Sequence, residues 1–274
     1  MPPSYNSPIL VTGGNGFVAS HIISQLLAKG YRVRLLYRFN LISILVFVVN
    51  CELFGLQQVR TSVRDITKEA NYAFLKSLPN ADNNLEIFPA DLNNVDSFSP
   101  GFTDVEIVLH VASPYVLNVT NPQKDLVDPA VNGTKAILDL CHTHPLVKRL
   151  VLTSSVAAVS DCFDSNKIYN EDDWNVTSSL VRNPYYYSKT LAEREAVRFM
   201  EEHPDTHFDL VRINPFVVLG PSLNGKLNES HQALLAFLDG TVPGVIDVSH
   251  SICDVRDIAT AHIVAFENPE ASGR

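Results

Sequence analysis

A glycine-rich turn near the N-terminus constrains this chain more than any other stretch. An apolar run at residues 9–11 leads into a glycine cluster at residues 12–16, and an amphipathic segment at residues 17–29 follows at once. This order predicts a strand, a tight turn and a helix. Gly13 and Gly16 would let the backbone approach a pyrophosphate, whose charge the helix N-terminus would face. The alternative is an ordinary strand-to-helix turn, which also needs glycines for its geometry.

Strand-like and helix-like runs alternate along the rest of the chain. Strands are predicted at residues 85–88, 105–111, 149–153 and 208–213, and helices at residues 70–78, 126–141, 187–202 and 255–266. Such alternation implies right-handed crossovers and a parallel sheet that is covered on both faces. We therefore predict an α/β fold with a doubly wound parallel sheet, as a single domain over residues 1–274. The sequence is less regular after Pro215, where we expect a smaller substrate lobe to begin.

Two segments compete for the place of the second strand. Residues 31–36 lead into an apolar run at residues 41–49, which is too short to span a bilayer and is typical of a buried strand. A second strand-like start then appears at residues 59–65, and it repeats an earlier Val-Arg pair. Removing residues 34–59 would leave one continuous strand. We hypothesise that this segment is not native coding sequence; the alternative is a genuine insertion, since loops tolerate extra length at little entropic cost.

Composition and charge narrow the class of protein. The chain has 30 acidic and 21 basic residues and a net charge of −9, which argues against general nucleic-acid binding. Its four cysteines are scattered without a CxxC pair, so we expect reduced thiols and neither a disulfide frame nor a metal site. The N-terminus lacks the basic and apolar regions of a signal peptide. We therefore expect a soluble, cytoplasmic protein that binds no membrane.

A tyrosine and a lysine four residues apart carry the most specific chemistry. Tyr185 and Lys189 share one face of a helix, and Ser154 and Ser155 end the preceding predicted strand. A nearby ammonium favours the phenolate and lowers the pKa of a tyrosine, which makes it a usable general acid near neutral pH. A serine at the strand end could polarise a carbonyl oxygen, because ligands of open parallel sheets bind there. The alternative is a tyrosine–lysine pair on an ordinary helix surface.

With these motifs in place, the chain resembles an extended short-chain dehydrogenase/reductase. Within that superfamily it is similar to the dihydroflavonol-reductase-like group, especially fungal aldehyde, ketone and methylglyoxal reductases. The matching motifs run in family order through Tyr185 and Lys189, and they are residues 11–17, 89–92, 110–114, 129–134, 152–155, 214–215 and 254–257. The resemblance implies a Rossmann fold. It also implies that the substrate lobe is incomplete, because relatives continue beyond the last residue of this chain.

The resemblance assigns catalytic roles to four residues. It implies that Ser155, and not Ser154, orients a substrate carbonyl. Tyr185 is the implied proton donor, because it alone of three consecutive tyrosines lies four residues before Lys189. Lys189 is implied to lower the pKa of that tyrosine and to hold the cofactor ribose. Asn132 matches a helix asparagine that serves a proton relay in many relatives; its alternative is a buried polar helix residue.

The resemblance also implies NADP(H) as the cofactor. An acidic residue at the end of the second strand would bind the ribose hydroxyls of NAD, whereas an arginine suits the 2′-phosphate of NADP. Arg64 occupies this position if the second strand is the later candidate, and its planar fork matches phosphate oxygens. Lys68 is a second candidate, or else a solvated helix residue. The other implied cofactor contacts are Gly13, Gly16, Phe17, Asp91, Leu92, Val111, Ala112, Ser113, Tyr185, Lys189, Pro215 and Val218.

Together these features predict NADPH-dependent reduction of an aldehyde or ketone to an alcohol. Hydride would pass to the carbonyl carbon of a small-molecule substrate while Tyr185 protonates the oxygen. One alternative is a sugar-nucleotide epimerase or dehydratase, although residues 110–114 resemble the reductases more closely. Another is an inactive or purely dinucleotide-sensing protein, a class that often loses the tyrosine and lysine retained here. The sequence specifies neither the carbonyl substrate nor an oligomeric state.

Deleting residues 34–59 tests the hypothesis that this segment is foreign to the fold. The segment combines apolar character with high β-propensity, which favours aggregation. We expect the deleted form to be more soluble and to bind NADPH more tightly than the form that retains it, when both carry a complete substrate lobe. Soluble yield and NADPH titration measure the two effects. Equal behaviour of the two forms would contradict the hypothesis.

Overall fold

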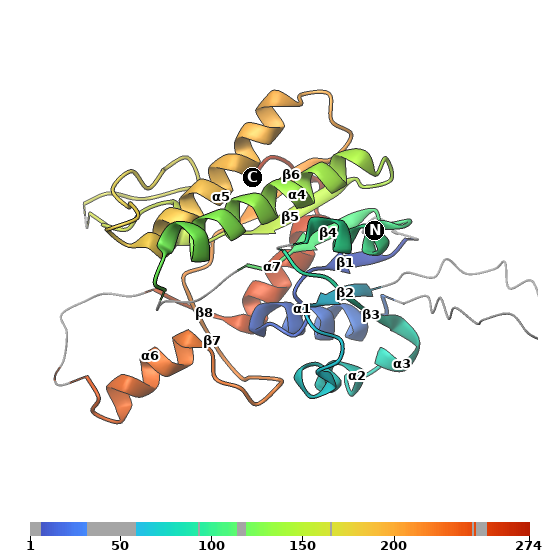
Figure 1. Ribbon diagram of the computed structural model, residues 1–274, viewed down its shortest axis with the longest axis horizontal. Coiled ribbons are helices and arrows are strands. Elements are labelled where there is room, and N and C mark those ends of the chain that lie inside the picture. Colours follow the sequence, from blue (N-terminus) through green and yellow to red (C-terminus); the bar gives the residue numbers. More distant parts are fainter. Residues whose placement is uncertain are drawn as a thin grey trace, which may run out of the picture.

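A six-stranded parallel sheet forms the centre of the molecule (Figure 1). The computed structural model describes residues 7–31, 59–92, 94–113, 119–164, 166–242, 244 and 251–274. The strand order is β3-β2-β1-β4-β5-β6, which confirms the doubly wound α/β fold. The strands are β1 (Ile9–Val11), β2 (Val59–Val63), β3 (Leu85–Pro89), β4 (Ile107–His110), β5 (Arg149–Thr153) and β6 (Asp209–Ile213).

The later of the two candidate segments forms the second strand. Val59 of β2 pairs with Ile9 of β1 on one side and with Leu85 of β3 on the other. The condition attached to Arg64 is therefore met, since Arg64 directly follows this strand. Of the earlier candidate strand only Tyr31 is described; its remaining residues and the suspected insertion up to residue 58 lie outside the described residues.

Most of the strands are buried because helices cover both faces of the sheet, whereas the edge strand β3 is only half-buried. Successive side chains of a strand point to opposite faces, and β1 shows the consequence. Ile9 and Val11 belong to a core cluster with residues of α1 (Phe17–Ala28) and α7 (Val255–Glu267). Leu10 belongs to a second cluster with residues of α4 (Asp128–Thr143) and α5 (Pro184–Glu202). Figure 1 shows these two helix pairs on opposite sides of the sheet.

Three predicted helices differ in detail from the structure. The segment at residues 70–78 is not one helix but a 3-10 turn, Glu69–Asn71, followed by α2 (Ala73–Lys76). The predicted helix at residues 126–141 continues to Thr143 and is preceded by a π-helical turn, Gln123–Val127. α5 begins three residues earlier than predicted, with a proline at its first position, where a missing N–H costs nothing.

The connections also contain short elements that the sequence did not predict. They are α3 (Ala81–Asn84), η2 (Val95–Phe102), η4 (Val156–Ala158) and η5 (Pro269–Ala271). Their lengths are too small to give a clear hydrophobic period. α3 follows Asn80, which adopts a left-handed conformation (φ 66°), as asparagine does more readily than most residues.

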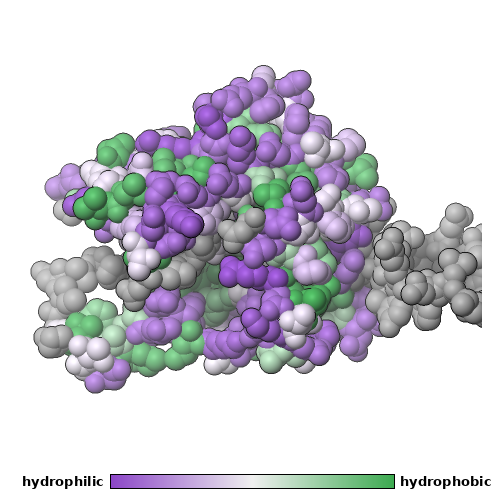
Figure 2. Space-filling view, in the orientation of Figure 1, coloured by the Kyte–Doolittle hydropathy of each residue, from purple (hydrophilic) through white to green (hydrophobic). Residues whose placement is uncertain are grey.

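A small second sheet and a peripheral helix follow Pro215. β7 (Val217–Leu219) pairs in parallel with β8 (Ile252–Asp254), and α6 (Glu229–Leu238) lies between them in the chain. No residue of α6 is buried, and Figure 2 shows apolar side chains gathered over this helix. Its exposed apolar residues are Leu234, Leu235, Phe237 and Leu238. Within the described part of the chain, no helix is both long and apolar enough to cross a membrane.

Candidate functional site

The glycine turn places backbone N–H groups at the carboxyl end of β1. Gly13 has a φ of +73°, a conformation that favours glycine, and a Cβ there would lie 3.0 Å from the Cα of Ala112. Gly16 is the N-cap of α1, and its N–H donates to the carbonyl of Gly13 at 2.8 Å. The first turn of α1, which begins at Phe17, has no acidic residue, and no side chain caps it. The turn therefore presents an uncapped helix N-terminus, the arrangement that binds a phosphate group.

Thr12 fastens this turn to the end of the neighbouring strand β4. Its Oγ1 accepts hydrogen bonds from the N–H groups of Val111 and Ala112, each at 3.0 Å. The hydroxyl proton is then directed to Nδ1 of His110, 2.9 Å away. Burial, assisted by the charge of Lys189, lowers the pKa of His110 to about 3, so the ring is neutral and carries its proton on Nε2. Residues 111–113 are thereby held beside the glycine turn.

The ends of β2 and β3 hold the residues predicted for the adenosine end of a cofactor. Arg64 exposes 74% of its side chain, and its Nε lies 3.7 Å from Oδ2 of Asp91. Lys68 is also exposed, with its Nζ 3.2 Å from Oδ2 of Asp65. Leu92 packs against Gly133 of α4, where a Cβ would lie 3.0 Å from Cδ2 of Leu92. Two solvent-facing cations thus follow β2.

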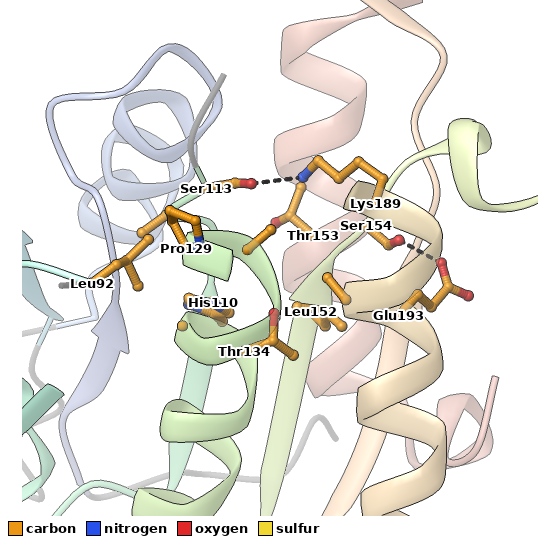
Figure 3. Close-up of a pocket in the computed structure, with 14 residues that line it drawn as sticks. Leu92, His110, Ser113, Pro129, Thr134, Leu152, Thr153, Ser154, Lys189 and Glu193 are labelled. Atoms are coloured by element: carbon orange, nitrogen blue, oxygen red, sulfur yellow. Dashed lines mark hydrogen bonds between the residues drawn. The ribbon is translucent and has the colours of Figure 1, made fainter. Parts of the chain in front are cut away.

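Lys189 connects α5 to the end of β4. Its Nζ donates to Oγ of Ser113 at 3.0 Å, as Figure 3 shows. The side chain is buried, and burial lowers the pKa of Lys189 from 10.5 to about 8, although the negative charge of Glu193 opposes this shift. Tyr185 lies one helical turn earlier, in the first turn of α5. The structure thus unites the predicted lysine and Ser113, which come from different elements.

The end of β5 is tied to the same helix through Glu193. Ser154 donates its hydroxyl proton to Oε2 of Glu193 (Figure 3). Asn214 bridges the same carboxylate oxygen, at 2.7 Å, and the carbonyl of Ser155, at 3.1 Å. Arg212 supplies the opposite charge, with its Nη1 3.0 Å from Oε1 of Glu193. Sequence reasoning missed this buried network; its one signal was the spacing of Glu193, four residues after Lys189.

A small polar cavity lies among these groups, between the ends of β4 and β5 and helices α4 and α5. Its volume is about 20 Å³, enough for one water molecule. Its polar lining comprises His110, Ser113, Thr134, Thr153, Ser154, Lys189 and Glu193 (Figure 3). Among the residues that the structure describes, no three His, Cys, Asp or Glu side chains are arranged to hold a metal ion.

Other predicted site residues lie in three different settings. Ser155 caps η4, since its Oγ accepts from the N–H of Ala157 at 3.1 Å. Pro215 lies beside it, because its carbonyl accepts from Val156 N at 3.0 Å. Val218 lies in β7. Asn132, in contrast, lines an outer groove between α4 and α5 and does not line the polar cavity.

The segment after β7, residues 220–231, crosses the glycine turn. Asn224 donates its amide to the carbonyl of Asn15 at 3.4 Å. Lys226 reaches Oδ1 of Asn71, 2.7 Å away, in the turn that follows Lys68. These contacts join residues more than 150 positions apart, and no sequence signal indicated them. We call residues 220–231 the strap.

Comparison with known proteins identifies the family. The model of the NAD dependent epimerase/dehydratase family matches residues 9–274. The chain belongs to this family. Cinnamoyl-CoA reductase CAD2 of Medicago truncatula is 34% identical to this chain, and the aligned region covers 97% of this chain and 74% of the relative. The NADPH-dependent methylglyoxal reductase GRE2 of Saccharomyces cerevisiae is 33% identical, over 97% and 76%.

Solved structures agree with this assignment. This chain is similar to Gre2 from Candida albicans, whose crystal structure is a complex with NADPH. The two share 31% sequence identity with a TM-score of 0.78, over 98% of this chain and 76% of the other. Such agreement extends the family relationship from sequence to the arrangement of strands and helices.

The buried ammonium of Lys189 predicts a specific dependence of stability on pH. Because the pKa is about 8 in the folded protein and 10.5 normally, the unfolded chain binds more protons between these values. Stability from this group therefore rises with pH across that window, by about 3 kcal/mol. Urea titrations of the parent and of Lys189→Met measure the two free energies of unfolding. We expect the difference, parent minus variant, to rise with pH across this window. Parallel pH curves would refute this, and exposed Lys148→Met is the control.

Proposed function

We propose that this protein is an NADPH-dependent reductase that converts an aldehyde or ketone into an alcohol. The observation that carries the proposal is the buried Lys189, bound to Ser113, with Tyr185 one turn earlier on the same helix. Ser155 lies two residues beyond the end of the adjacent strand β5, where it caps η4. Relatives named as cinnamoyl-CoA, methylglyoxal and tetraketide alpha-pyrone reductases support reduction over epimerisation or dehydration, which the family name also covers.

The residues at the strand ends fit a bound NADPH. Glycine at position 13 lets the turn pack against Ala112, where a Cβ would be crowded, and a glycine turn between a strand and a helix suits the close approach of a pyrophosphate. Gly16 and Phe17 begin the helix that would face its charge. Arg64 would hold the 2′-phosphate. The carboxylate of Asp65, which follows it, is already engaged by hydrogen bonds from Thr67. The remaining proposed contacts are Lys68, Asp91, Leu92, Val111, Ala112, Ser113, Pro215 and Val218.

The proposed reaction uses three side chains of this chain. NADPH, when bound, supplies the hydride. Tyr185 donates its phenolic proton to the carbonyl oxygen of the substrate, and the positive charge of Lys189 favours the phenolate that remains. Ser155 donates a hydrogen bond that orients the carbonyl. Asn132 stays the predicted proton-relay residue; it lines the outer groove, and no step of the reaction is assigned to it here.

The residues after Pro215 are proposed to begin the substrate side of the enzyme. Phe216 directly follows Pro215, and Val156 N donates to the carbonyl of Pro215, so this segment lies against the serine strand end. The apolar side chains of α6 suit an enzyme that covers a carbonyl substrate and excludes water. A panel of methylglyoxal, an aliphatic aldehyde, an aromatic aldehyde and a ketone tests the activity by following NADPH oxidation. Failure to oxidise NADPH with any of them would refute the proposal.

Replacing Tyr185 by phenylalanine should abolish turnover while NADPH still binds. Only the hydroxyl transfers the proton, whereas the ring packs; general acid catalysis is typically worth about 10²- to 10⁴-fold. Steady-state kinetics and NADPH titration of Tyr185→Phe measure the two effects. Tyr186→Phe, the adjacent tyrosine, is the matched control and should keep its kcat. A near wild-type kcat in Tyr185→Phe would remove this residue from the mechanism.

Replacing Arg64 by alanine should weaken NADPH binding selectively. A charge-assisted hydrogen bond is worth about 1.5–3 kcal/mol, and NADH lacks the phosphate that receives it. We expect the Kd of NADPH to rise about 10- to 100-fold and that of NADH to stay nearly constant. Lys76→Ala removes a nearby cation that pairs with Glu69 and serves as the control. Equal losses for both dinucleotides in Arg64→Ala would rule out the phosphate role.

A further inference from the structure

Asp161 is a charged residue in the segment that follows Ser155, its side chain is covered, and the proposed mechanism does not use it. It follows η4, six residues after Ser155. Its carboxylate side chain has no exposed surface. It accepts hydrogen bonds from Nδ2 of Asn183 at 2.8 Å, from Nε of Arg182 at 3.2 Å and from the hydroxyl of Thr177. A charge buried in this way is retained only where donors compensate it, and here three donors do so.

Asn183, one of these donors, determines how the chain enters α5. It is the N-cap residue, with φ 52° and ψ 59°, a left-handed conformation that is unfavourable for most residues. Its side chain makes no capping hydrogen bond to the helix and donates to Asp161 instead. Its carbonyl accepts from Tyr187 N at 3.0 Å, which starts the helical hydrogen-bond pattern. The direction of the first turn, which holds Tyr185, therefore depends on this residue.

The loop between the two segments is braced on the serine side as well. Asn175 is buried, and its Nδ2 donates to the carbonyl of Ala157 at 2.8 Å. Its backbone N–H donates to the carbonyl of Ala158, also at 2.8 Å. Both acceptors belong to η4, which Ser155 caps. Asp161 thus joins a segment anchored at Ser155 to the residue that starts the helix of Tyr185.

The carboxylate keeps its charge at working pH. Burial alone would raise the pKa of Asp161, but hydrogen bonds from Thr177 and Asn183 and the charge of Arg182 outweigh it and hold the pKa below 3.8. A neutral amide at this position has one oxygen to accept from the donors, and its NH₂ group would face a donor in place of the second oxygen. The connection therefore requires a carboxylate and not merely a side chain of that shape.

We propose that Asp161 is a positioning residue that sets the separation of the Ser155 and Tyr185 hydroxyls. This inference rests on the proposed function. Both hydroxyls must meet one carbonyl oxygen, and a displacement of about 1 Å at a reacting group can cost about 10²-fold in rate. Lys189 and the glycine turn are held by separate contacts, to Ser113 and Thr12. Cofactor binding is accordingly independent of Asp161.

The first experiment replaces Asp161 by asparagine in the full chain. With the carbonyl from the test panel that the parent reduces fastest, kcat should fall about 10- to 100-fold. The Kd of NADPH should stay within about twofold, because the cofactor contacts do not involve this loop. Asp164→Asn is the matched control: this residue lies in the same loop, and its carboxylate accepts from Asn166 instead. It should leave both quantities unchanged.

A double-mutant cycle separates positioning from simple support of the loop. Asn183→Ala keeps the carboxylate but removes its donor and disfavours the left-handed conformation. It should lower kcat as Asp161→Asn does, and the double variant should show little further loss, because both act through one contact. Asn183→Ala also decides the matter should Asp161→Asn fail to fold.

Several results would overturn the inference. They are an unchanged kcat in Asp161→Asn, parallel losses of kcat and NADPH affinity, or independent effects that multiply in the double variant. The proposed function fails separately, if the parent protein oxidises NADPH with none of the carbonyls in the panel. An inactive Tyr185→Phe together with a fully active Asp161→Asn would sink only the positioning role.

Discussion

The buried carboxylate of Glu193 is the interaction on which the rest of the candidate site depends. Its two oxygens bind Ser154 at the end of β5, Asn214 after β6 and the guanidinium of Arg212. A buried carboxylate without partners would cost several kcal/mol, and removing one partner from a buried ion pair typically costs about 3–5 kcal/mol. The requirement to satisfy this one charge therefore fixes two strand ends against α5. Because Lys189 lies one turn earlier on the same helix, the contacts of Glu193 also position Lys189.

A second set of contacts performs the same task on the other half of the sheet. Thr12 joins the ends of β1 and β4, and Lys189 reaches across from α5 to Ser113, at the end of that same β4. The strand order reverses between β1 and β4, and ligands of open parallel sheets bind where this reversal leaves a crevice. The glycine turn and the lysine helix are consequently linked through a single strand end. The glycine turn, Ser113 and Lys189 are far apart in the sequence, and these contacts bring them together at one strand end.

Much of the sheet was predictable because its strands are continuous apolar runs with charged or glycine-rich ends. β1 and β5 were predicted to the residue, and β3 and β6 nearly so. β2 was ambiguous, because two segments had the same Val-Arg start and only pairing with β1 distinguishes them. β7 and β8, three residues each, are too short to show a period. The helix predicted at residues 70–78 is interrupted, which local propensity does not reveal.

The candidate site divides along a similar line. Residues held by their own strand end or helix turn, such as Ser113 and Lys189, were predictable from motif and spacing. The surroundings of Asn132 were not, because the face that a helical residue presents depends on how the helix packs; it lines an outer groove, and its relay role stays a prediction. The partners of Glu193, and the strap with its Lys226–Asn71 contact, join distant segments. Only the folded chain brings such pairs together.

The position of α7 has a consequence for how the protein is made. α1 is covered by a helix some 230 residues later: Lys29 pairs with Glu267, and Gln25 donates to the carbonyl of Arg256. Synthesis runs from the N-terminus, so β1 and α1 leave the ribosome long before their cover exists. Contacts of such high sequence separation also form slowly. The side of α1 that α7 covers therefore has no partner until the last part of the described chain has been synthesised.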